Sequence, residues 1–283
     1  MIQIVPCKPF FISKCGEKNA RVLLAGVPLD VTGSFRTGTK NAPSSIREIS
    51  WTLEDYDVDE GRCISDVPFY DSGDIFFTGD LNHNLKEIEM FVRGAWKQKK
   101  KVLLLGGEHL ITYPAVKAVS QFEKDVCFVV FDAHTDMGDH ERNMDLSHAS
   151  TTKLICEILG KERIFLFGAR SGTEEDFEFV KKNVFYRRFP PDDGEIKILK
   201  GKKIYLSVDI DVLDPSVAPG VSTPEVMGWS FSQLIETIEK ICSICEIVGA
   251  DVVEVCPPYD PSQVTALFSS VITRRLLRFL AKK

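Results

Sequence analysis

Three short polar segments contain residue types that bind metal ions, and each follows an apolar run with the composition of a buried strand. The segments are residues 106–109 after the run 101–105, residues 132–136 after the run 126–131, and residues 209–211 after the run 203–208. Side chains two positions apart in an extended backbone point the same way. The sequence therefore predicts one cleft that six metal-ligating side chains face: His109, Asp132, His134, Asp136, Asp209 and Asp211.

Four carboxylates in one cleft would raise one another's pKa unless positive charge neutralised them, and two divalent cations would supply that charge. Carboxylate and imidazole ligands together favour Mn²⁺ or another first-row metal over Ca²⁺ and Mg²⁺, and no nearby cysteine set indicates structural zinc. Two such metals lower the pKa of a shared water enough to give hydroxide near neutral pH. A single aspartate at a strand end is often only a cap or turn residue. Three such segments at three strand ends favour a metal centre, and the chemistry that it predicts is hydrolysis.

These segments need a regular scaffold, and the chain has the pattern of alternating strands and helices. Further strand-like runs occupy residues 21–27, 163–167 and 247–255, and helical periodicity occupies residues 85–96 and 231–241. Ser230 and Gln233 open the second helix in capping-box order. The alternation predicts an α/β fold with a mostly parallel central sheet covered by helices on both faces. Ligands of such sheets bind beyond the carboxyl ends of the strands. No linker or repeat divides the chain, so we expect one domain over residues 1–283.

Composition excludes several classes of partner. The chain has 283 residues, 35 basic and 41 acidic side chains, a net charge of -6 and no long basic stripe. We therefore expect a small cationic ligand and neither nucleic acid nor a membrane surface as a partner. No signal peptide or apolar run of membrane-spanning length is recognisable, which predicts a cytoplasmic protein. The eight cysteines lie in apolar contexts, which predicts mostly reduced thiols, and the C-x-x-C at residues 242–245 has no second pair for a metal site.

The chain also resembles the ureohydrolases, the family of arginase, agmatinase and their relatives, over nearly its whole length. The shared motifs are Gly38 with Ala42-Pro43 and Ile46-Arg47, Gly106-Gly107-Glu108-His109, Asp132-Ala133-His134-Thr135-Asp136, Gly168-Ala169-Arg170, Ser207-Val208-Asp209-Ile210-Asp211 with Asp214-Pro215, Pro219-Gly220, Thr223-Pro224 and Asp251-Val252-Val253-Glu254-Val255. The resemblance implies a three-layer α/β/α sandwich and two Mn²⁺ per chain. It implies that a metal-bridging hydroxide hydrolyses a guanidino group to urea and an amine. It further implies a homo-oligomer, a trimer or a hexamer.

The resemblance assigns roles to individual residues. One metal would bind His109, Asp132, Asp136 and Asp209, and the other would bind His134, Asp132, Asp209 and Asp211, with Asp132 and Asp209 as bridges. Glu254 matches the glutamate that binds the guanidinium group, and a carboxylate suits a planar cation that must be oriented in front of a nucleophile. His148 matches a histidine that passes a proton to the leaving amine, a role for which imidazole is suited.

Residues around these motifs predict which guanidino compound is the substrate. Arginases hold the α-carboxylate with a serine and an asparagine shortly before the shuttle histidine, and residues 144–147 contain no asparagine. The acidic residue that arginases place after the Gly-x-Arg motif for the α-amino group also looks absent. The chain therefore resembles agmatinases, which convert agmatine to putrescine and urea. We expect Asp139, Glu141 or Asp145 to receive the terminal amine of agmatine, and Thr223 to contact the substrate.

Some positions depart from the family pattern and leave alternatives open. Glu108 and Leu110 flank His109 where the family usually has aspartate and serine, and the longer acid at Glu108 is expected to push against His109 and weaken metal binding. An arginase or a guanidino-acid hydrolase, for example one acting on 4-guanidinobutyrate, would need a basic partner such as Arg36 or Arg142. A non-catalytic polyamine-binding protein of this fold is a further alternative. Deacetylases share the fold but use one zinc ion and an adjacent histidine pair, which this chain lacks.

Overall fold

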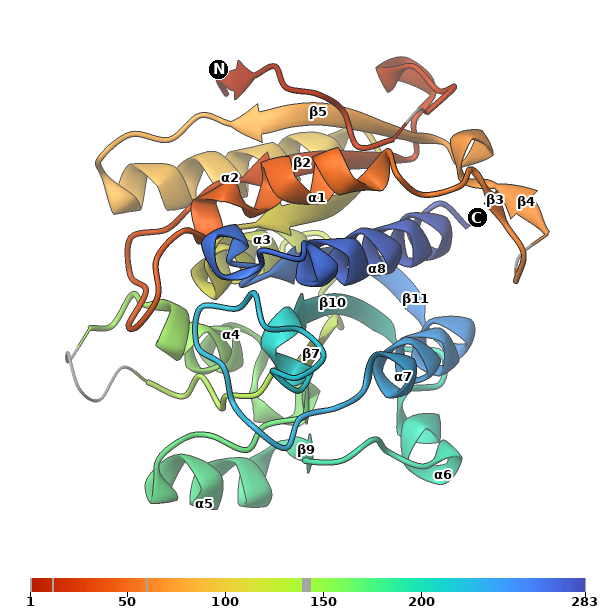
Figure 1. The fold of residues 1–283 in the computed structure, drawn as a ribbon. Coiled ribbons are helices and arrows are strands. Elements are labelled where there is room, and N and C mark those ends of the chain that lie inside the picture. Colours follow the sequence, from red (N-terminus) through yellow and green to blue (C-terminus); the bar gives the residue numbers. More distant parts are fainter. Residues whose placement is uncertain (1, 12, 60, 139–143, 283) are drawn as a thin grey trace.

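A large twisted sheet forms the centre of the molecule. The computed structural model describes residues 2–11, 13–59, 61–138 and 144–282. Within these ranges, nine strands form one sheet in the order β1-β5-β2-β6-β11-β10-β7-β8-β9 (Figure 1). The strands are β1 (Ile4–Val5), β2 (Val22–Val27), β5 (Phe69–Ile75), β6 (Lys101–Gly106), β7 (Cys127–Phe131), β8 (Ile164–Phe167), β9 (Phe185–Arg187), β10 (Lys203–Asp209) and β11 (Glu246–Val253). Neighbouring strands are parallel except β1 and β5. The short strands β3 (Tyr56–Asp57) and β4 (Arg62–Cys63) form a separate antiparallel pair.

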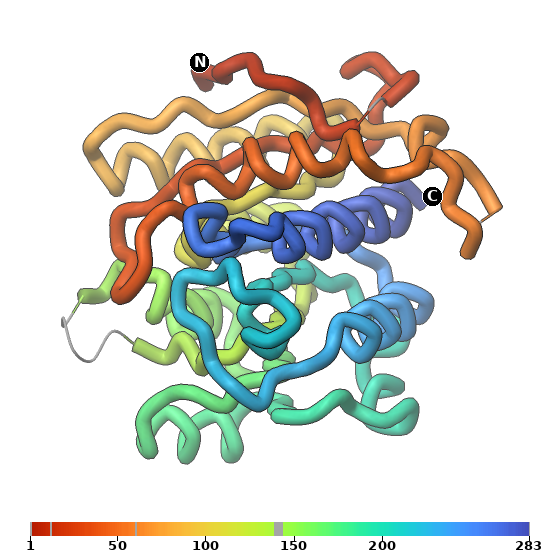
Figure 2. The backbone as a smooth tube through the Cα atoms, viewed as in Figure 1, coloured from red at the N-terminus to blue at the C-terminus, as the bar shows by residue number. Residues whose placement is uncertain are grey.

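Helices cover both faces of the sheet. One face carries α2 (Leu81–Lys97), α3 (Thr112–Val119), α4 (Thr151–Leu159) and α5 (Glu174–Asn183). The other face carries α1 (Ala42–Ser50), α6 (Asp193–Ile196), α7 (Phe231–Ile244) and α8 (Val264–Leu280). Helices α1 and α8 pack against each other, and the tube in Figure 2 shows them side by side. The predicted three-layer α/β/α sandwich with a mostly parallel sheet is confirmed.

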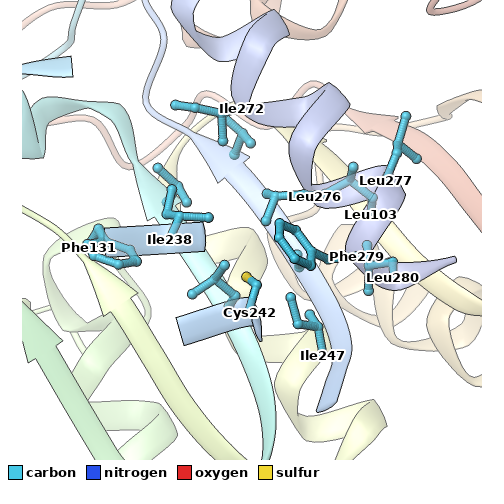
Figure 3. Close-up of a cluster of buried hydrophobic side chains, with 14 of the residues drawn as sticks. Leu103, Phe131, Ile238, Cys242, Ile247, Ile272, Leu276, Leu277, Phe279 and Leu280 are labelled. Carbon is cyan, nitrogen blue, oxygen red and sulfur yellow. The ribbon is translucent and has the colours of Figure 1, made fainter. Parts of the chain in front are cut away.

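Alternation of side chains along the central strands fills two apolar cores. Leu103 of β6 faces the core shared with α7 and α8, whereas its neighbour Val102 faces the core shared with α2 and α3. Figure 3 shows part of the first core, where Leu276 of α8, Ile238 of α7 and Ile247 of β11 lie close together. Complete burial of one such side chain contributes about 1.5–3 kcal/mol. Both cores therefore hold the central strands, and with them the polar segments at the strand ends, in fixed positions.

The six strands expected from the apolar runs are confirmed as β2, β6, β7, β8, β10 and β11, with ends that differ by one or two residues. The two expected helices are α2 and α7, and Ser230 caps α7 by accepting a hydrogen bond of 3.2 Å from the Gln233 amide. The apolar pattern does not predict β5, because Asp71 and Asp74 interrupt it. In the structure, both carboxylates form ion pairs with the buried Arg47 of α1.

Two expectations about the chain as a whole also have an outcome in the described ranges. All eight cysteines lie there as free thiols; Cys127, Cys242 and Cys256 are buried, and the other five are half-buried. No helix there combines the length and the apolar composition needed to cross a membrane.

Candidate active site

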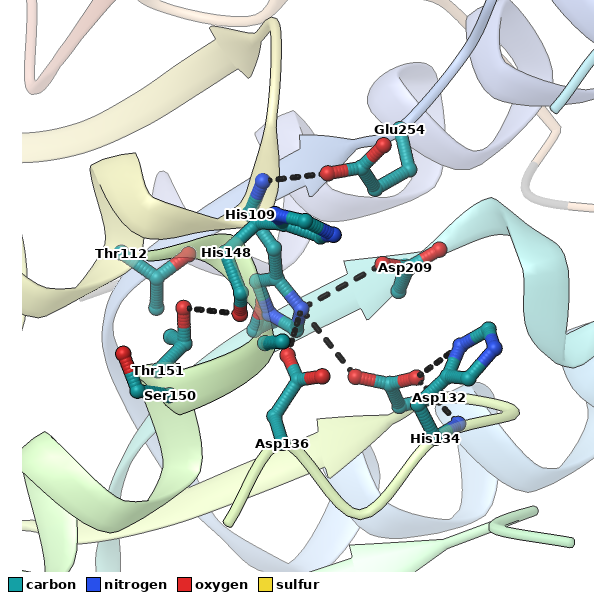
Figure 4. Close-up of polar contacts among 12 residues, drawn as sticks. His109, Thr112, Asp132, His134, Asp136, His148, Ser150, Thr151, Asp209 and Glu254 are labelled. Carbon is teal, nitrogen blue, oxygen red and sulfur yellow. Dashed lines mark hydrogen bonds and ion pairs between the residues drawn. The ribbon is translucent and has the colours of Figure 1, made fainter. Parts of the chain in front are cut away.

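Four neighbouring strands, β6, β11, β10 and β7, end at the same place and carry the candidate ligands. His109 follows β6 at the start of a 3-10 turn, and its Nδ1 atom lies 3.1 Å from Oδ2 of Asp132 and 3.1 Å from Oδ2 of Asp136 (Figure 4). The same nitrogen lies 3.3 Å from Oδ2 of Asp209. One imidazole nitrogen thus faces three carboxylates, two from the loop after β7 and one from the end of β10.

A second group of ligand atoms adjoins the first through Asp132. His134 Nδ1 lies 2.9 Å from Oδ2 of Asp211 and 3.6 Å from Oδ1 of Asp132, whereas Oδ2 of Asp132 faces His109. In the described ranges, His109 with Asp132 and Asp136, and His134 with Asp132 and Asp211, are each compact enough to hold a metal ion. Ligand atoms at ~2.1 Å from a first-row metal are about 3 Å apart, which these distances match. The structure therefore brings all six predicted ligands together.

Turns, and not continuous strands, bring these side chains together, so the expected reason for the grouping is wrong. β7 ends before Asp132, and Asp136 has a left-handed backbone with φ of 48°. Asp211 lies in the 3-10 turn Ile210–Val212 after β10. Carboxylates hold these turns through backbone amides: the His134 amide donates to Asp132 Oδ1 at 2.6 Å, and the Asp211 amide donates to Asp209 Oδ1 at 2.9 Å. Simple alternation along an extended chain would not have produced this geometry.

Residues behind His109 fix the orientation of its ring. Its Nε2 atom lies 3.0 Å from Ser207 Oγ, and Ser207 donates its hydroxyl hydrogen to Asp251 Oδ1 at 2.5 Å. Asp251 also accepts from Tyr205 at 2.8 Å and from Thr112 at 2.9 Å, all of them buried. Since Ser207 has one hydrogen and gives it to Asp251, it accepts from His109, which places the ring hydrogen on Nε2. Nδ1 then carries a lone pair toward the carboxylates.

The negative charge of the clustered carboxylates favours the binding of cations. Burial raises the pKa of Asp136 to about 6, and the charge of Asp132 raises it too. Burial, then the charges of Asp211 and Asp132, raise the pKa of Asp209 well above its usual range. His109 Nδ1 and Asp132 Oδ2 lie 3.1 Å apart, are buried and have no hydrogen-bond partner among the described residues. Burial lowers the pKa of His109, but hydrogen bonds to Asp132, Asp136 and Asp209 outweigh this and raise it well above its usual range. When the ring is neutral, two lone pairs face each other at this distance and a metal ion can lie between them, so the residues fit divalent metals.

Glu254 lies directly beyond this cluster. Its carboxylate accepts a hydrogen bond of 2.6 Å from the His109 amide and another from the Ser222 hydroxyl. Its own backbone is left-handed, with φ of 64°, which turns the side chain from the end of β11 toward the cavity. Burial raises the pKa of Glu254 to about 7; the Ser222 hydrogen bond opposes this shift and the charge of Glu108 adds to it.

The remaining predicted residues have different outcomes. His148 lies in the 3-10 turn His148–Ser150, and it lines the same cavity as the metal-type ligands, as does Thr223. Asp145 is exposed and does not line the cavity. Asp139 and Glu141, the other expected amine ligands, lie outside the described residues, as does Arg142. The expected push of Glu108 against His109 is wrong, because the Glu108 carboxylate points to residues 31–32 and accepts three hydrogen bonds there. Leu110 is fully buried in an apolar core.

The cavity in front of the cluster has a volume of about 330 Å³. Acidic and histidine side chains dominate its charged lining: Asp136, Asp176, Asp209, Asp211, Glu254, His109, His134 and His148. No arginine or lysine among the described residues lines it. Arg36 instead stacks on Tyr259 and donates to the carbonyls of Pro219 and Val221. The described lining is therefore suited to a cation.

Sequence analysis misses several residues that support the site. Ser207 is two positions before Asp209 on β10, so strand alternation places both side chains on the same side of the sheet. This spacing alone could have predicted Ser207 as a site residue. Ser222 lies next to the expected Thr223. Asp176 is a buried carboxylate in the cavity wall, and Glu225 has its Oε1 atom 3.7 Å from His134 Nε2. They lie shortly after the Gly168-Ala169-Arg170 and Thr223-Pro224 motifs, but neither belongs to a motif that predicts its role.

Comparison with known proteins defines the class. The model of the arginase family matches residues 20–278, and the chain belongs to that family. It is 35% identical over 276 residues to an agmatinase of Halalkalibacterium halodurans, covering 95% of this chain and 96% of the relative. It is 36% identical to an agmatinase of Bacillus subtilis, covering 95% of both chains. The crystal structure of the agmatine ureohydrolase of Thermoplasma volcanium matches with a TM-score of 0.86 at 30% identity, covering 98% of this chain and 95% of that one. The resemblance to ureohydrolases is confirmed, and the chain is an agmatinase-like hydrolase.

Proposed function

We propose that this chain hydrolyses agmatine to putrescine and urea, with two Mn²⁺ ions as its cofactor. The observation that carries the proposal is the charge of the cavity wall, which has five carboxylates and, among the described residues, no arginine or lysine. Agmatine is a cation at both ends. Arginine and 4-guanidinobutyrate each bring a carboxylate, and the described wall offers no arginine or lysine to pair with it. The agmatinases among the similar proteins support the same choice.

Six side chains of this chain would hold the metals in the arrangement expected from the family: His109, Asp132, Asp136 and Asp209 for one, and His134, Asp132, Asp209 and Asp211 for the other. The two oxygens of Asp132 face the two histidines, which supports its role as a bridge. When bound, such a metal pair supplies hydroxide near neutral pH as the nucleophile. Ser207 would keep the lone pair of His109 Nδ1 directed at the first metal.

Glu254 would orient the guanidinium group. Its two oxygens are held by the His109 amide and the Ser222 hydroxyl, so the carboxylate has a fixed direction beside the metal ligands. A planar guanidinium binds such a carboxylate through paired N–H donors, which fixes the carbon that is attacked. His148, with Nε2 3.3 Å from Ser34 Oγ in the cavity wall, would donate a proton to the leaving amine.

The terminal amine of agmatine needs a carboxylate at the other end of the cavity. Asp145, expected from the sequence, is exposed and outside the cavity wall, so its role stays a prediction. Asp176 is buried, belongs to that wall and is therefore the better candidate; Thr223 would contact the methylene chain or the guanidine. A cytoplasmic location and a trimeric or hexameric state also stay predictions.

The test is urea release by the Mn²⁺-loaded chain from agmatine, arginine and 4-guanidinobutyrate at equal concentrations. We expect kcat/KM for agmatine to exceed that for the other two by at least about 100-fold, since an unpaired carboxylate in an acidic pocket costs several kcal/mol. Asp132→Asn is the blank. A preference for arginine or 4-guanidinobutyrate would overturn the assignment of substrate, and binding of agmatine without urea release would favour the non-catalytic alternative.

A further inference from the structure

Glu108 connects the metal-ligand strand to a distant loop. It stands between Gly107 and His109 at the end of β6, and only 1% of its surface is exposed. Oε2 accepts hydrogen bonds from the amides of Val31 at 2.7 Å and Thr32 at 2.8 Å, and Oε1 accepts from the Thr32 hydroxyl at 2.8 Å. A buried carboxylate with three donors from one short segment holds that segment firmly.

Thr32 in turn contacts His148. The His148 amide donates to Thr32 Oγ1 at 2.9 Å, and the ring atom Nδ1 lies 3.3 Å from the same oxygen. The other ring nitrogen, Nε2, lies 3.3 Å from Oγ of Ser34, which lines the cavity. Thr32 is 1% exposed and His148 is 9% exposed, so the contact between them is buried. Both ring nitrogens of His148 therefore have a contact with the loop after β2.

The carboxylate of Glu108 sets the direction of these hydrogen bonds. A threonine hydroxyl has one hydrogen, and an ionised carboxylate can only accept, so Thr32 gives its hydrogen to Glu108. The lone pairs of Thr32 Oγ1 are then available to the amide and to Nδ1 of His148, and this favours a hydrogen on Nδ1. Ser147 Oγ also lies 3.3 Å from Nδ1 and accepts a hydrogen bond from the Ala149 amide.

We infer that Glu108 and Thr32 are positioning residues that keep the neutral ring of His148 in the tautomer with hydrogen on Nδ1. This inference rests on the proposed function, in which His148 supplies a proton to the leaving amine. Nε2 is then the nitrogen that exchanges a proton with the substrate side. Nε2, which has a lone pair in this tautomer, takes up the proton that the attacking water loses. As the C–N bond breaks, its electron pair stays on the amine nitrogen, which takes this proton from Nε2. The ring returns to its neutral form with hydrogen on Nδ1, so no internal proton shift is needed before the next turnover.

Exchanging Glu108 for glutamine gives a sharp test, because the change keeps the volume and reverses one hydrogen bond. The glutamine amide nitrogen would face Thr32 Oγ1 and donate to it, while its oxygen still accepts from the amides of residues 31 and 32. The Thr32 hydroxyl hydrogen is then released and can donate to Nδ1 of His148. Glu108→Gln should therefore favour the opposite tautomer, with hydrogen on Nε2.

The direct readout is the ¹⁵N NMR signature of the His148 ring in the full chain loaded with diamagnetic Zn²⁺. Spectra are recorded at rising pH until the ring signals stop changing, so that they report the tautomer of the neutral ring. The signal that disappears in His148→Asn is the one assigned. We expect hydrogen on Nδ1 in the wild type and in Thr32→Ser, a mixture in Thr32→Val, and hydrogen on Nε2 in Glu108→Gln. The same tautomer in all four proteins, or hydrogen on Nε2 in the wild type, would overturn the inference.

Kinetics with agmatine and Mn²⁺ provide the second readout. Thr32→Val should lower kcat by about 10–100-fold with KM changed less than twofold, whereas Thr32→Ser, which keeps the hydroxyl, should stay within threefold of the wild type. In a His148→Asn background the valine change should cause no further loss, because its effect acts through that ring. An equal loss in both backgrounds would show a merely structural role. If the wild type releases no urea, the proposed function fails, while the NMR signature still decides the tautomer.

Discussion

At the scale of single residues, the hydrogen bond between His109 and Ser207 decides which ring nitrogen faces the acidic cluster. Ser207 is bound to the buried Asp251 and can only accept from His109, so the lone pair at Nδ1 is fixed. A ring without this partner would be free to turn or to carry its hydrogen on Nδ1, which no metal can bind. The serine thus contributes to metal affinity without touching a metal.

We predict that Ser207→Ala lowers the affinity for the first-bound Mn²⁺ by about 10–100-fold, the usual cost of removing such a supporting partner. Ser243→Ala is the matched control, since Ser243 is exposed on α7 and bonds only the Lys240 carbonyl in the described structure. Isothermal titration of the chelated protein with Mn²⁺ measures both. Equal affinities for the two variants would remove Ser207 from the metal site.

The proposed role of Glu254 in binding the guanidinium group leads to a prediction about substrate binding. Glu254→Gln keeps the shape but removes the charge that pairs with guanidinium, which is worth about 2–3 kcal/mol for a charge-assisted bond. We expect kcat/KM for agmatine to fall by roughly 30–200-fold with two Mn²⁺ still bound. Steady-state kinetics and metal analysis on the same sample measure these quantities. Loss of metal together with activity would instead make Glu254 a ligand.

The candidate metal ligands could be predicted from residue types, because His109 and the aspartates follow apolar runs whose ends must meet. Glu254 is expected only from the family resemblance, since it lies within the apolar run 247–255. Asp176 and Glu225 could not be predicted, since their positions depend on loops that return to the site from other elements. Glu108 shows a second limit of prediction from the sequence. Its type and position suggested a clash with His109, and only the fold shows residues 31–32 as its partners.

At the scale of elements, Arg170 connects the loop after β8 to two other loops at the carboxyl end of the sheet. Its guanidinium donates to the carbonyls of Asp211 at 2.9 Å and Glu225 at 2.8 Å, and also to those of Gly168, Val212, Leu213 and Val226. These carbonyls belong to the turn that carries a metal-type ligand and to the segment that faces His134. One side chain therefore holds several parts of the cavity wall together.

Removing the Arg170 guanidinium should lower the stability of the fold. We predict that Arg170→Met lowers the free energy of unfolding by about 3 kcal/mol, because several half-buried carbonyls lose their donor at once. The control is Arg93→Met, whose arginine is exposed on α2 and pairs with Glu89 one turn away; a loss below about 0.5 kcal/mol is expected there. Urea denaturation measures both variants. A loss of similar size in the control would mean that arginine removal as such, and not the loop contacts, sets the cost.

Elements with continuous apolar runs could be predicted from the sequence, and those with buried charge could not. β10 and β11 are apolar on both faces because helices cover both sides of the sheet. Their continuous apolar sequence therefore predicts a buried strand. β5 contains Asp71 and Asp74, which read as loop residues until Arg47 of α1 is known to lie beside them. Arg47 is 24 residues from Asp71 and 27 residues from Asp74 in sequence, and local patterns do not reveal such pairs.

At the scale of the whole molecule, the acidic cluster couples metal binding to stability. Without metal, the folded chain holds carboxylates whose pKa is raised to about 6 at Asp136 and about 7 at Glu254, against about 3.9 and 4.3 for ordinary side chains. A raised pKa in an acid means that the folded state binds protons more tightly than the unfolded one. This contribution is fully present below about pH 4 and is lost as the pH rises through 6 and 7.

The metal-free protein should therefore become less stable between pH 5 and pH 7.5. We expect its Tm to fall by on the order of 5–10 °C over this window. In a chain of about this size, each kcal/mol lost from the free energy of unfolding lowers the Tm by about 2–4 °C. Asp136→Asn should show a smaller fall, and Mn²⁺ should raise the Tm most at the upper end, where protons no longer neutralise the cluster. Thermal unfolding in chelating buffer measures this. A Tm of the metal-free protein that does not change with pH would contradict the electrostatic description of the site.

The measurement that tests the metal centre most directly is the number of Mn²⁺ ions bound per chain at saturation. We predict two for the wild type and for Asp145→Asn, whose carboxylate is exposed and outside the cavity wall. We predict at most one for Asp132→Asn, because the two oxygens of Asp132 face both groups of ligands. A single ion in the wild type, or two in Asp132→Asn, would contradict a binuclear centre that shares Asp132.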